Sequence, residues 1–167
     1  MSEINTKAMY NLSYGLFVCT AVQGDKINGC IVNTAIQVAS EPNRISVAIN
    51  KANFTHDMVK ATGQCNISVI SQDATFDLFK HFGFQSGRDV DKFAAYPIAN
   101  YQTSENGIPY ITVGTNAYFS LKVEKTVDLG SHTLFICEPV ADDSCNTRTA
   151  FLQLPASVPI TFGQAIL

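Results

Sequence analysis

The sequence lacks the features that mark several large classes of protein. It contains no run of about 18 apolar residues, which a helical membrane span needs, and no apolar segment behind a basic start, as a secretory signal has. Its formal net charge is −3, and its lysines and arginines form no basic stripe that would follow a nucleic-acid backbone. We therefore expect a soluble, cytoplasmic protein without a membrane or nucleic-acid partner.

Two cofactor motifs are missing as well. No Gly-x-Gly-x-x-Gly loop follows a strand pattern, so a dinucleotide-binding fold is not expected. The five cysteines contain no Cys-x-x-Cys pair, which argues against a zinc cage or an iron–sulfur cluster, and no metal site is expected. Four cysteines fall within apolar strand patterns and are expected to be buried thiols: Cys19, Cys30, Cys65 and Cys137.

What remains has the composition of an ordinary globular domain. The chain has 167 residues, of which 46% are hydrophobic, and this is enough to bury a substantial core. No internal repeat, linker or low-complexity run divides it. We expect a single domain over residues 1–167.

Strand patterns dominate the chain. Residues 14–22 and 27–38 are rich in apolar and β-branched side chains and flank a Gly24-Asp25 turn, as in a hairpin. Residues 45–50 and 65–70 alternate in polarity, which is the period of a strand with unlike faces. Asn106-Gly107 is a strong hairpin signal. Further strands are expected at residues 98–103, 110–113, 117–127, 132–140 and 158–162.

Short helices are expected between the strands. One covers residues 53–62, with Asn53 or Thr55 as its cap and Gly63 as its stop. A second covers residues 74–82 after a cap at Asp73, and its aromatic face, typical of a core contact, consists of Phe76, Phe79 and Phe82. A third is expected at residues 147–154. This mixture favours a mainly β fold, a closed antiparallel barrel with two or three short helices, since closure removes exposed strand edges.

A row of small polar side chains lies within one of the strand patterns. Asn33, Thr34 and Gln37 are uncharged hydrogen-bonding groups that match the alternating acceptors and donors of a flat polar ring. The alternative is that this row is simply the solvent-facing side of a strand.

A second polar group stands where the first helix begins. Asn50, Lys51, Thr55 and His56 combine a cation and a hydroxyl with the free amides of a helix start, which favours an anion such as a phosphate. The alternative is a capping threonine beside a surface lysine.

Four segments together resemble the flavin reductase-like family. They are residues 29–42, with Asn33, Thr34, Glu41 and Pro42 in matching places; residues 45–56, ending in Thr55-His56; the Ser-Gly…Asp-Lys-Phe loop at 82–93; and residues 130–140 around His132. Ser131 stands where relatives commonly have Asp, and Cys137 where they commonly have Gly. The tyrosine-rich tail of many relatives is missing after Asp143.

This resemblance implies a Greek-key split β-barrel that binds FMN at a homodimer interface. By resemblance the cofactor-binding residues are Ile31, Val32, Asn33, Thr34, Gln37, Asn50, Lys51, Thr55, His56 and Phe84. His132 is expected near the flavin face where a nicotinamide stacks, and is the candidate catalytic residue. The alternative for His132 is a satisfied histidine at a strand start, with no contact to a ligand.

The resemblance implies an FMN-dependent oxidoreductase. NADH or NADPH, bound transiently, would reduce the flavin, which would pass electrons to free flavin or to a small redox protein such as rubredoxin. Two alternatives remain open: an electron-transfer flavoprotein of the flavoredoxin type without NAD(P)H activity, and a non-catalytic FMN-binding module.

Overall fold

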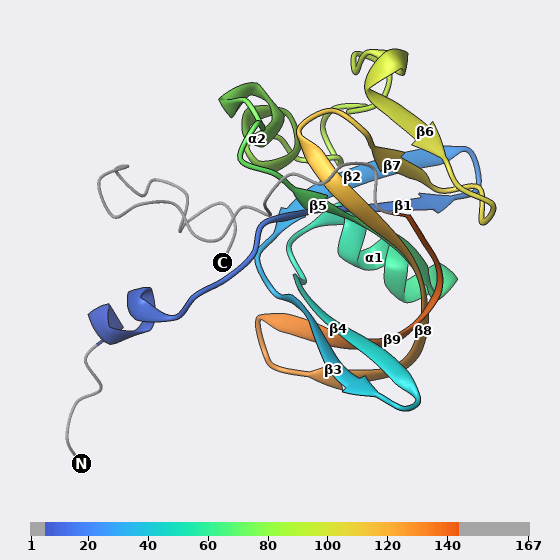
Figure 1. Cartoon of the computed structure of the whole chain (residues 1–167). Coiled ribbons are helices and arrows are strands. Elements are labelled where there is room, and N and C mark those ends of the chain that lie inside the picture. Colours follow the sequence, from blue (N-terminus) through green and yellow to red (C-terminus); the bar gives the residue numbers. More distant parts are fainter. Residues whose placement is uncertain (1–5, 144–167) are drawn as a thin grey trace.

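A computed structural model describes residues 6–143 of the chain, and in this part the fold is mainly β with two α-helices (Figure 1). Seven strands form one antiparallel sheet in the order β2-β1-β5-β8-β9-β4-β3, and β6 pairs with β7 in a small second sheet. The strands are β1 (Phe17–Gln23), β2 (Lys26–Val32), β3 (Ala35–Ser40), β4 (Asn43–Asn50), β5 (Gln64–Ile70), β6 (Tyr101–Thr103), β7 (Pro109–Ile111), β8 (Thr115–Asp128) and β9 (His132–Asp143). The helices are α1 (Phe54–Thr62) and α2 (Phe76–Gly83), with short 3-10 helices at Thr6–Asn11 and Ile98–Asn100.

The strand expected at 27–38 is in fact two strands. It breaks at Asn33 and Thr34, so that β2 pairs with β1 while β3 pairs with β4. At the break, the Thr34 carbonyl accepts a hydrogen bond from the Ala48 amide at 3.2 Å, and the Thr34 hydroxyl donates to the Ala48 carbonyl at 3.2 Å. The polar pair thus takes the chain from one edge of the sheet to the other, because β2 and β3 are the edge strands.

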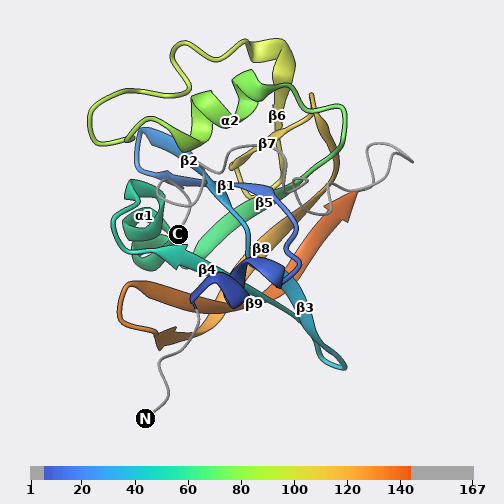
Figure 2. The same ribbon diagram turned by 90° about the vertical axis from the view of Figure 1, so that its left-hand side faces the viewer.

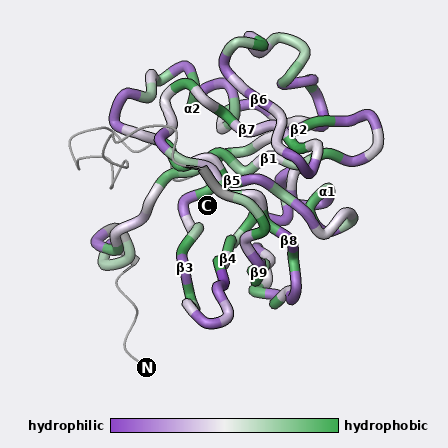
Figure 3. The backbone as a smooth tube through the Cα atoms, turned by 45° about the vertical axis from the view of Figure 1, so that its right-hand side comes forward, coloured by the Kyte–Doolittle hydropathy of each residue, from purple (hydrophilic) through white to green (hydrophobic). Residues whose placement is uncertain are grey.

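The core lies on both faces of this curved sheet. Inside the curve, Met58 and Val59 of α1 pack with buried strand residues such as Val47, Ile49 and Phe135 (Figure 1). The outer face of β1 and β2 is covered by α2 and the segment after it (Figure 2). Hydropathy changes back and forth along the strands in Figure 3, as expected of a sheet with unlike faces.

The helices expected at 53–62 and 74–82 both form, but the second begins later than its sequence suggested. In α1, Asn53 is the N-cap, and the Gly63 amide donates to the Val59 carbonyl at 2.8 Å from a left-handed backbone. In α2 the N-cap is Thr75, and the prediction of Asp73 was wrong. The reason is a turn before the helix, in which the Ala74 amide donates to the Ser71 carbonyl at 3.1 Å.

The aromatic face of α2 is a core contact, as expected. Phe79 and Phe82 are buried in the outer cluster, whereas Phe76 is half exposed. The Asn106-Gly107 hairpin between β6 and β7 is confirmed, with Gly107 at φ 78°. Residues 98–100, expected in a strand, instead form a 3-10 helix before β6.

The four cysteines expected in strands are free and buried. The helix expected at 147–154, the strand expected at 158–162 and Cys145 lie outside the described residues. No helix within residues 6–143 is long and apolar enough to cross a membrane.

Candidate functional site

A polar cavity of about 280 Å³ opens beside β2, at the start of α1. Its walls come from three parts of the chain: the β2 strand, the connection from β4 to α1, and the loop after α2. The lining residues are Asn28, Cys30, Ala52, Asn53, Phe54, Gly83, Phe84, Gln85, Ser86, Gly87 and Lys92. Among the residues expected at a binding site, Phe84 lines this cavity directly.

The free edge of β2 supplies backbone donors and acceptors next to this cavity. Gln23 and Lys26 close the two-residue turn as register partners, so alternate residues from Lys26 to Val32 bond to β1. The backbone groups of Gly29 and Ile31 therefore point away from the sheet. The Gly29 carbonyl bonds to Lys92, and the N–H and C=O of Ile31 lie at the edge beside it.

Lys92 is a buried cation that the sequence reasoning did not select. It is 3% exposed, and its Nζ donates to the carbonyls of Gly29 and Phe82, each at 2.8 Å. Burial lowers the pKa of Lys92 from its ordinary value, and the nearby Cys30 opposes this shift. No carboxylate pairs with Lys92 in the described chain. An ammonium that is buried without a counter-charge suits an anionic ligand.

Asn28 and Gly87 fit closely together at the back of the cavity. Asn28 Nδ2 donates to Thr55 Oγ1 at 3.0 Å, while Asn28 Oδ1 is buried without a hydrogen-bond partner in residues 6–143. A Cβ atom on Gly87 would lie 2.3 Å from Asn28 Oδ1, so only glycine fits here. The unpaired oxygen is an acceptor to which an N–H or O–H group of a ligand can donate.

Thr55 and His56 support the site without lining it. The Thr55 side chain is fully buried and accepts from Asn28. His56 is also buried, with Nε2 2.8 Å from Thr133 Oγ1 and Nδ1 3.0 Å from Asp57 Oδ1. These contacts fix the first turn of α1 against β2 and β9.

A salt bridge ties this same turn to the loop after α2. Arg88 Nη2 lies 2.6 Å from Asp57 Oδ2. The pKa of the Asp57 carboxyl is lowered, mainly by its hydrogen bond from Arg88 and secondarily by that from His56. The bridge holds one wall of the cavity to another.

Asn50 and Lys51 shape the turn that leads into α1. Asn50 Oδ1 accepts from the Ala52 amide at 2.9 Å, which folds residues 50–53 back toward the cavity. Lys51 points elsewhere: its Nζ donates to Asp128 Oδ1 at 2.7 Å in the turn between β8 and β9. The His56 amide donates to the Asn53 carbonyl at 3.1 Å, but Asn53 makes no side-chain hydrogen bond to cap α1, so the amides of Phe54 and Thr55 are the ones that a ligand can use.

His132 begins β9 opposite Asn50. Its Nδ1 lies 2.9 Å from Ser131 Oγ. Burial, and then the charge of His56, lower the pKa of His132 from its ordinary value. A lowered pKa leaves the imidazole neutral near pH 7, with one ring N–H to donate.

The remaining expected residues spread along β2 and β3. The side chains of Ile31 and Val32 are buried and the Val32 backbone bonds to β1, so of this pair only the Ile31 backbone can meet a ligand; Asn33 and Thr34 occupy the partly exposed break between the strands. Gln37 does not join them. It bonds to Asn43 at 3.0 Å and lines a separate, mostly apolar hollow of about 190 Å³.

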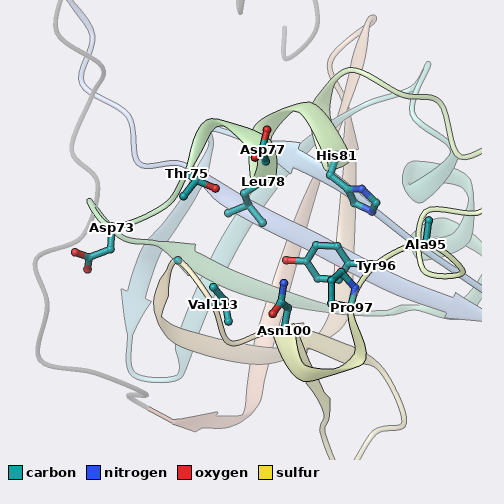
Figure 4. Close-up of a pocket in the computed structure, with 11 residues that line it drawn as sticks. Asp73, Thr75, Asp77, Leu78, His81, Ala95, Tyr96, Pro97, Asn100 and Val113 are labelled. Atoms are coloured by element: carbon teal, nitrogen blue, oxygen red, sulfur yellow. The ribbon is translucent and has the colours of Figure 1, made fainter.

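Two other hollows border the described part of the molecule. One of about 510 Å³ shares Phe54 and Gly87 with the cavity and extends it toward Lys26 and Arg88. The other, of about 260 Å³, lies between α2 and Tyr96 (Figure 4). Asp73 and Asp77 line it, no lysine or arginine of the described chain does, and burial raises the pKa of Tyr96 to about 12.

Comparisons with known proteins agree on one family. The model of the flavin reductase like domain matches residues 9–150. The chain is 44% identical over 133 residues to the high molecular weight rubredoxin of Moorella thermoacetica, covering 80% of this chain and 57% of that protein. It is 35% identical over 137 residues to the ferric-chelate reductase (NAD(P)H) of Archaeoglobus fulgidus, covering 82% and 79%.

Solved structures share the fold at lower identity. An NADH:FAD oxidoreductase from Streptomyces globisporus superposes with a TM-score of 0.77 at 20% identity, covering 91% of each chain. An FMN-binding protein from Thermus thermophilus superposes with a TM-score of 0.75 at 22% identity, covering 86% of this chain and 78% of that one. This chain spans little more than half of the length of the rubredoxin relative.

Proposed function

Because this chain belongs to the flavin reductase-like family, we propose that it is an FMN-dependent oxidoreductase that takes electrons from NADH or NADPH. Its acceptor would be free flavin or a small redox protein. Two relatives support this range, one named as an NAD(P)H ferric-chelate reductase and one as a rubredoxin. The observation that carries the proposal is the buried Lys92 ammonium lining a polar cavity with no carboxylate partner in the described chain.

The residues present fit FMN. Lys92 and the first amides of α1 offer positive charge and donors to a phosphate, and Asn28 Oδ1 offers an unpaired acceptor. The free backbone edge at Ile31, with Asn33 and Thr34 beyond it, offers neutral donors and acceptors to the ring. Phe84, 45% exposed beside the cavity, offers an apolar face.

Bound FMN would supply hydride acceptance and one- or two-electron transfer, and the chain supplies position and charge. Lys92 and the α1 turn would hold the phosphate end. Thr55, His56 and Asn50 would act behind them by fixing that turn. Neutral His132, which begins β9 opposite Asn50 and does not line the cavity, would donate one N–H to the nicotinamide and orient it without moving a proton.

We also propose that the sheet closes into a split barrel and that two copies form the complete site. Closure is supported by β2 and β3, which are opposite edges of the sheet yet are joined by only two residues. A second copy is supported by the cavity, whose volume of about 280 Å³ is just below the range of about 300–1,000 Å³ that ligand sites usually have. It is also supported by β3, where Ile36 is 63% and Val38 is 53% exposed.

The proposed function is tested by colour and by reduction. Freshly purified protein, or protein mixed with FMN and freed of excess, is expected to show bound flavin absorbance. Anaerobic mixing with NADH and with NADPH should bleach it within catalytic times. Bleaching only by a reduced protein donor would instead indicate an electron carrier, and failure to retain FMN would refute flavin binding.

His132 gives a prediction specific to the nicotinamide. His132→Ala is expected to slow flavin reduction by the preferred nicotinamide roughly 10-fold, about the value of one lost positioning hydrogen bond, with FMN affinity almost unchanged. Stopped-flow reduction and FMN titration measure the two effects separately. An unchanged reduction rate in His132→Ala would remove this residue from the nicotinamide site.

A further inference from the structure

Two cysteines face each other across the β1–β2 hairpin. Cys19 and Cys30 are register partners, and their place in the ladder makes them a hydrogen-bonded pair. Cα atoms in such pairs are about 5.5 Å apart, which is within the range that a disulfide spans. Both thiols are free in this structure.

The two thiols differ in their surroundings. Cys30 lines the 280 Å³ cavity, whereas Cys19 is fully buried behind it. Cys30 receives hydrogen bonds from Cys19 and Thr55 and lies near the Lys92 ammonium, and the Cys19 bond is the largest cause that lowers the pKa of Cys30. The pKa of Cys19 is raised, first by its hydrogen bond to Cys30.

This is the arrangement of an attacking thiol with a resolving partner. A reactive cysteine needs thiolate character, a nearby cation and access for a small reagent. Cys30 has the Lys92 ammonium and the cavity. Cys19 has neither, but it lies within reach of the Cys30 sulfur.

We propose that Cys30 and Cys19 form a peroxide-oxidisable thiol pair at the wall of the cavity. The Cys30 thiolate attacks one oxygen of hydrogen peroxide; an S–O bond forms, the O–O bond breaks, and hydroxide leaves and is protonated to water. The Cys19 sulfur then attacks the Cys30 sulfur; an S–S bond forms, the S–O bond breaks, and a second water leaves with the Cys19 proton. In total two thiols lose two electrons and one peroxide becomes two waters.

Oxidation changes the cavity whatever the cavity binds. The disulfide takes the Cys30 sulfur out of its hydrogen bond with Thr55 and alters the cavity wall that Cys30 and Lys92 share. Oxidation of the two thiols therefore does not require bound flavin and depends only on Cys30 and Cys19.

Cys65 and Cys137 provide the internal control. They are as buried as Cys19, and hydrogen bonds from Cys137 and then from Cys19 hold the pKa of Cys65 well below its ordinary value, but neither thiol lines the cavity. A lowered pKa alone would make Cys65 react at least as fast as Cys30, whereas access through the cavity makes Cys30 react at least about 10-fold faster than Cys65.

In the test, stoichiometric hydrogen peroxide is added to two samples of the protein: one as purified, and one from which any bound small molecule has been removed. Remaining thiols are alkylated, and peptide mapping by mass spectrometry is expected to show a Cys19–Cys30 link, two hydrogens lighter and reversed by dithiothreitol. Cys19→Ser should instead give a dimedone-trapped sulfenic acid at Cys30, and Cys65→Ser should behave like the wild type. Absence of the link in both samples, or equal rates for Cys30 and Cys65, would overturn the proposal.

Discussion

Lys92→Met is expected to weaken FMN binding about 100-fold and to abolish the preference for FMN over riboflavin. Methionine keeps the apolar length of the side chain but removes a buried ammonium, and charge-assisted hydrogen bonds are worth about 1.5–3 kcal/mol each. Riboflavin lacks the phosphate, so the wild type should bind FMN more tightly, and the variant should bind the two alike. Flavin fluorescence quenching measures both dissociation constants.

Lys51→Met is the matched control for this experiment. Lys51 is a partly exposed lysine that pairs with Asp128, so its loss is expected to change FMN affinity less than threefold. Retention of the preference for FMN by Lys92→Met would show that Lys92 does not hold the phosphate. If Lys51→Met lost that preference, the phosphate would lie at Lys51.

Lys92→Met should also lower the stability of the ligand-free protein. The carbonyls of Gly29 and Phe82 would lose their donor, and a buried unsatisfied carbonyl costs about 1–3 kcal/mol. Part of this loss is offset because the cation no longer has to be buried. Urea unfolding without ligand gives this stability change, which is separate from the FMN and riboflavin titrations on folded protein.

Much of the fold could be predicted from local signals. The Gly24-Asp25 and Asn106-Gly107 turns, the alternation at residues 45–50 and the Gly63 stop each act through neighbouring backbone, so the sequence around them was sufficient. The break at Asn33 and Thr34 could not be read this way. It depends on the pairing of Thr34 with Ala48, which lies on a different strand.

The site was harder to predict than the fold for the same reason. Lys51 looked like the anion ligand because it precedes a helix, yet Asp128, 77 residues later, pairs with it. Lys92 looked like part of a polar loop, and its only sequence signal was the Asp-Lys-Phe segment. Its burial arises from the docking of that loop against β2 and α2, where Gly29 and Phe82, respectively, supply the two carbonyls.

The docking of this loop depends on one glycine, and Gly87→Ala is expected to lower both stability and FMN affinity. The added Cβ would lie 2.3 Å from Asn28 Oδ1, and about as near to its Cγ and Nδ2. Asn28 cannot easily move, because it is buried and donates to Thr55. Overpacking of this kind costs about 1–3 kcal/mol, and the loop that carries Gly87 must lift from the cavity. We expect at least a 10-fold loss of FMN affinity, measured by titration.

Gly83→Ala is the control for an added methyl group in the same segment. Its Cβ would lie 3.3 Å from Ile31 Cγ1, a contact that a small shift relieves, so the loss of stability should stay below about 1 kcal/mol.

A double mutant separates the steric effect of the added methyl group in Gly87→Ala from any other role of Gly87. Asn28→Ala removes all three atoms that the new methyl group would meet, at the cost of the hydrogen bond to Thr55. In urea unfolding, the double mutant Asn28→Ala/Gly87→Ala should therefore lose about 1–3 kcal/mol less stability than the sum of the losses of the two single mutants. Simple additivity would mean that the loop does not rest on Asn28. In that case the cavity wall, and the anion site that Lys92 forms behind it, would need a different geometry.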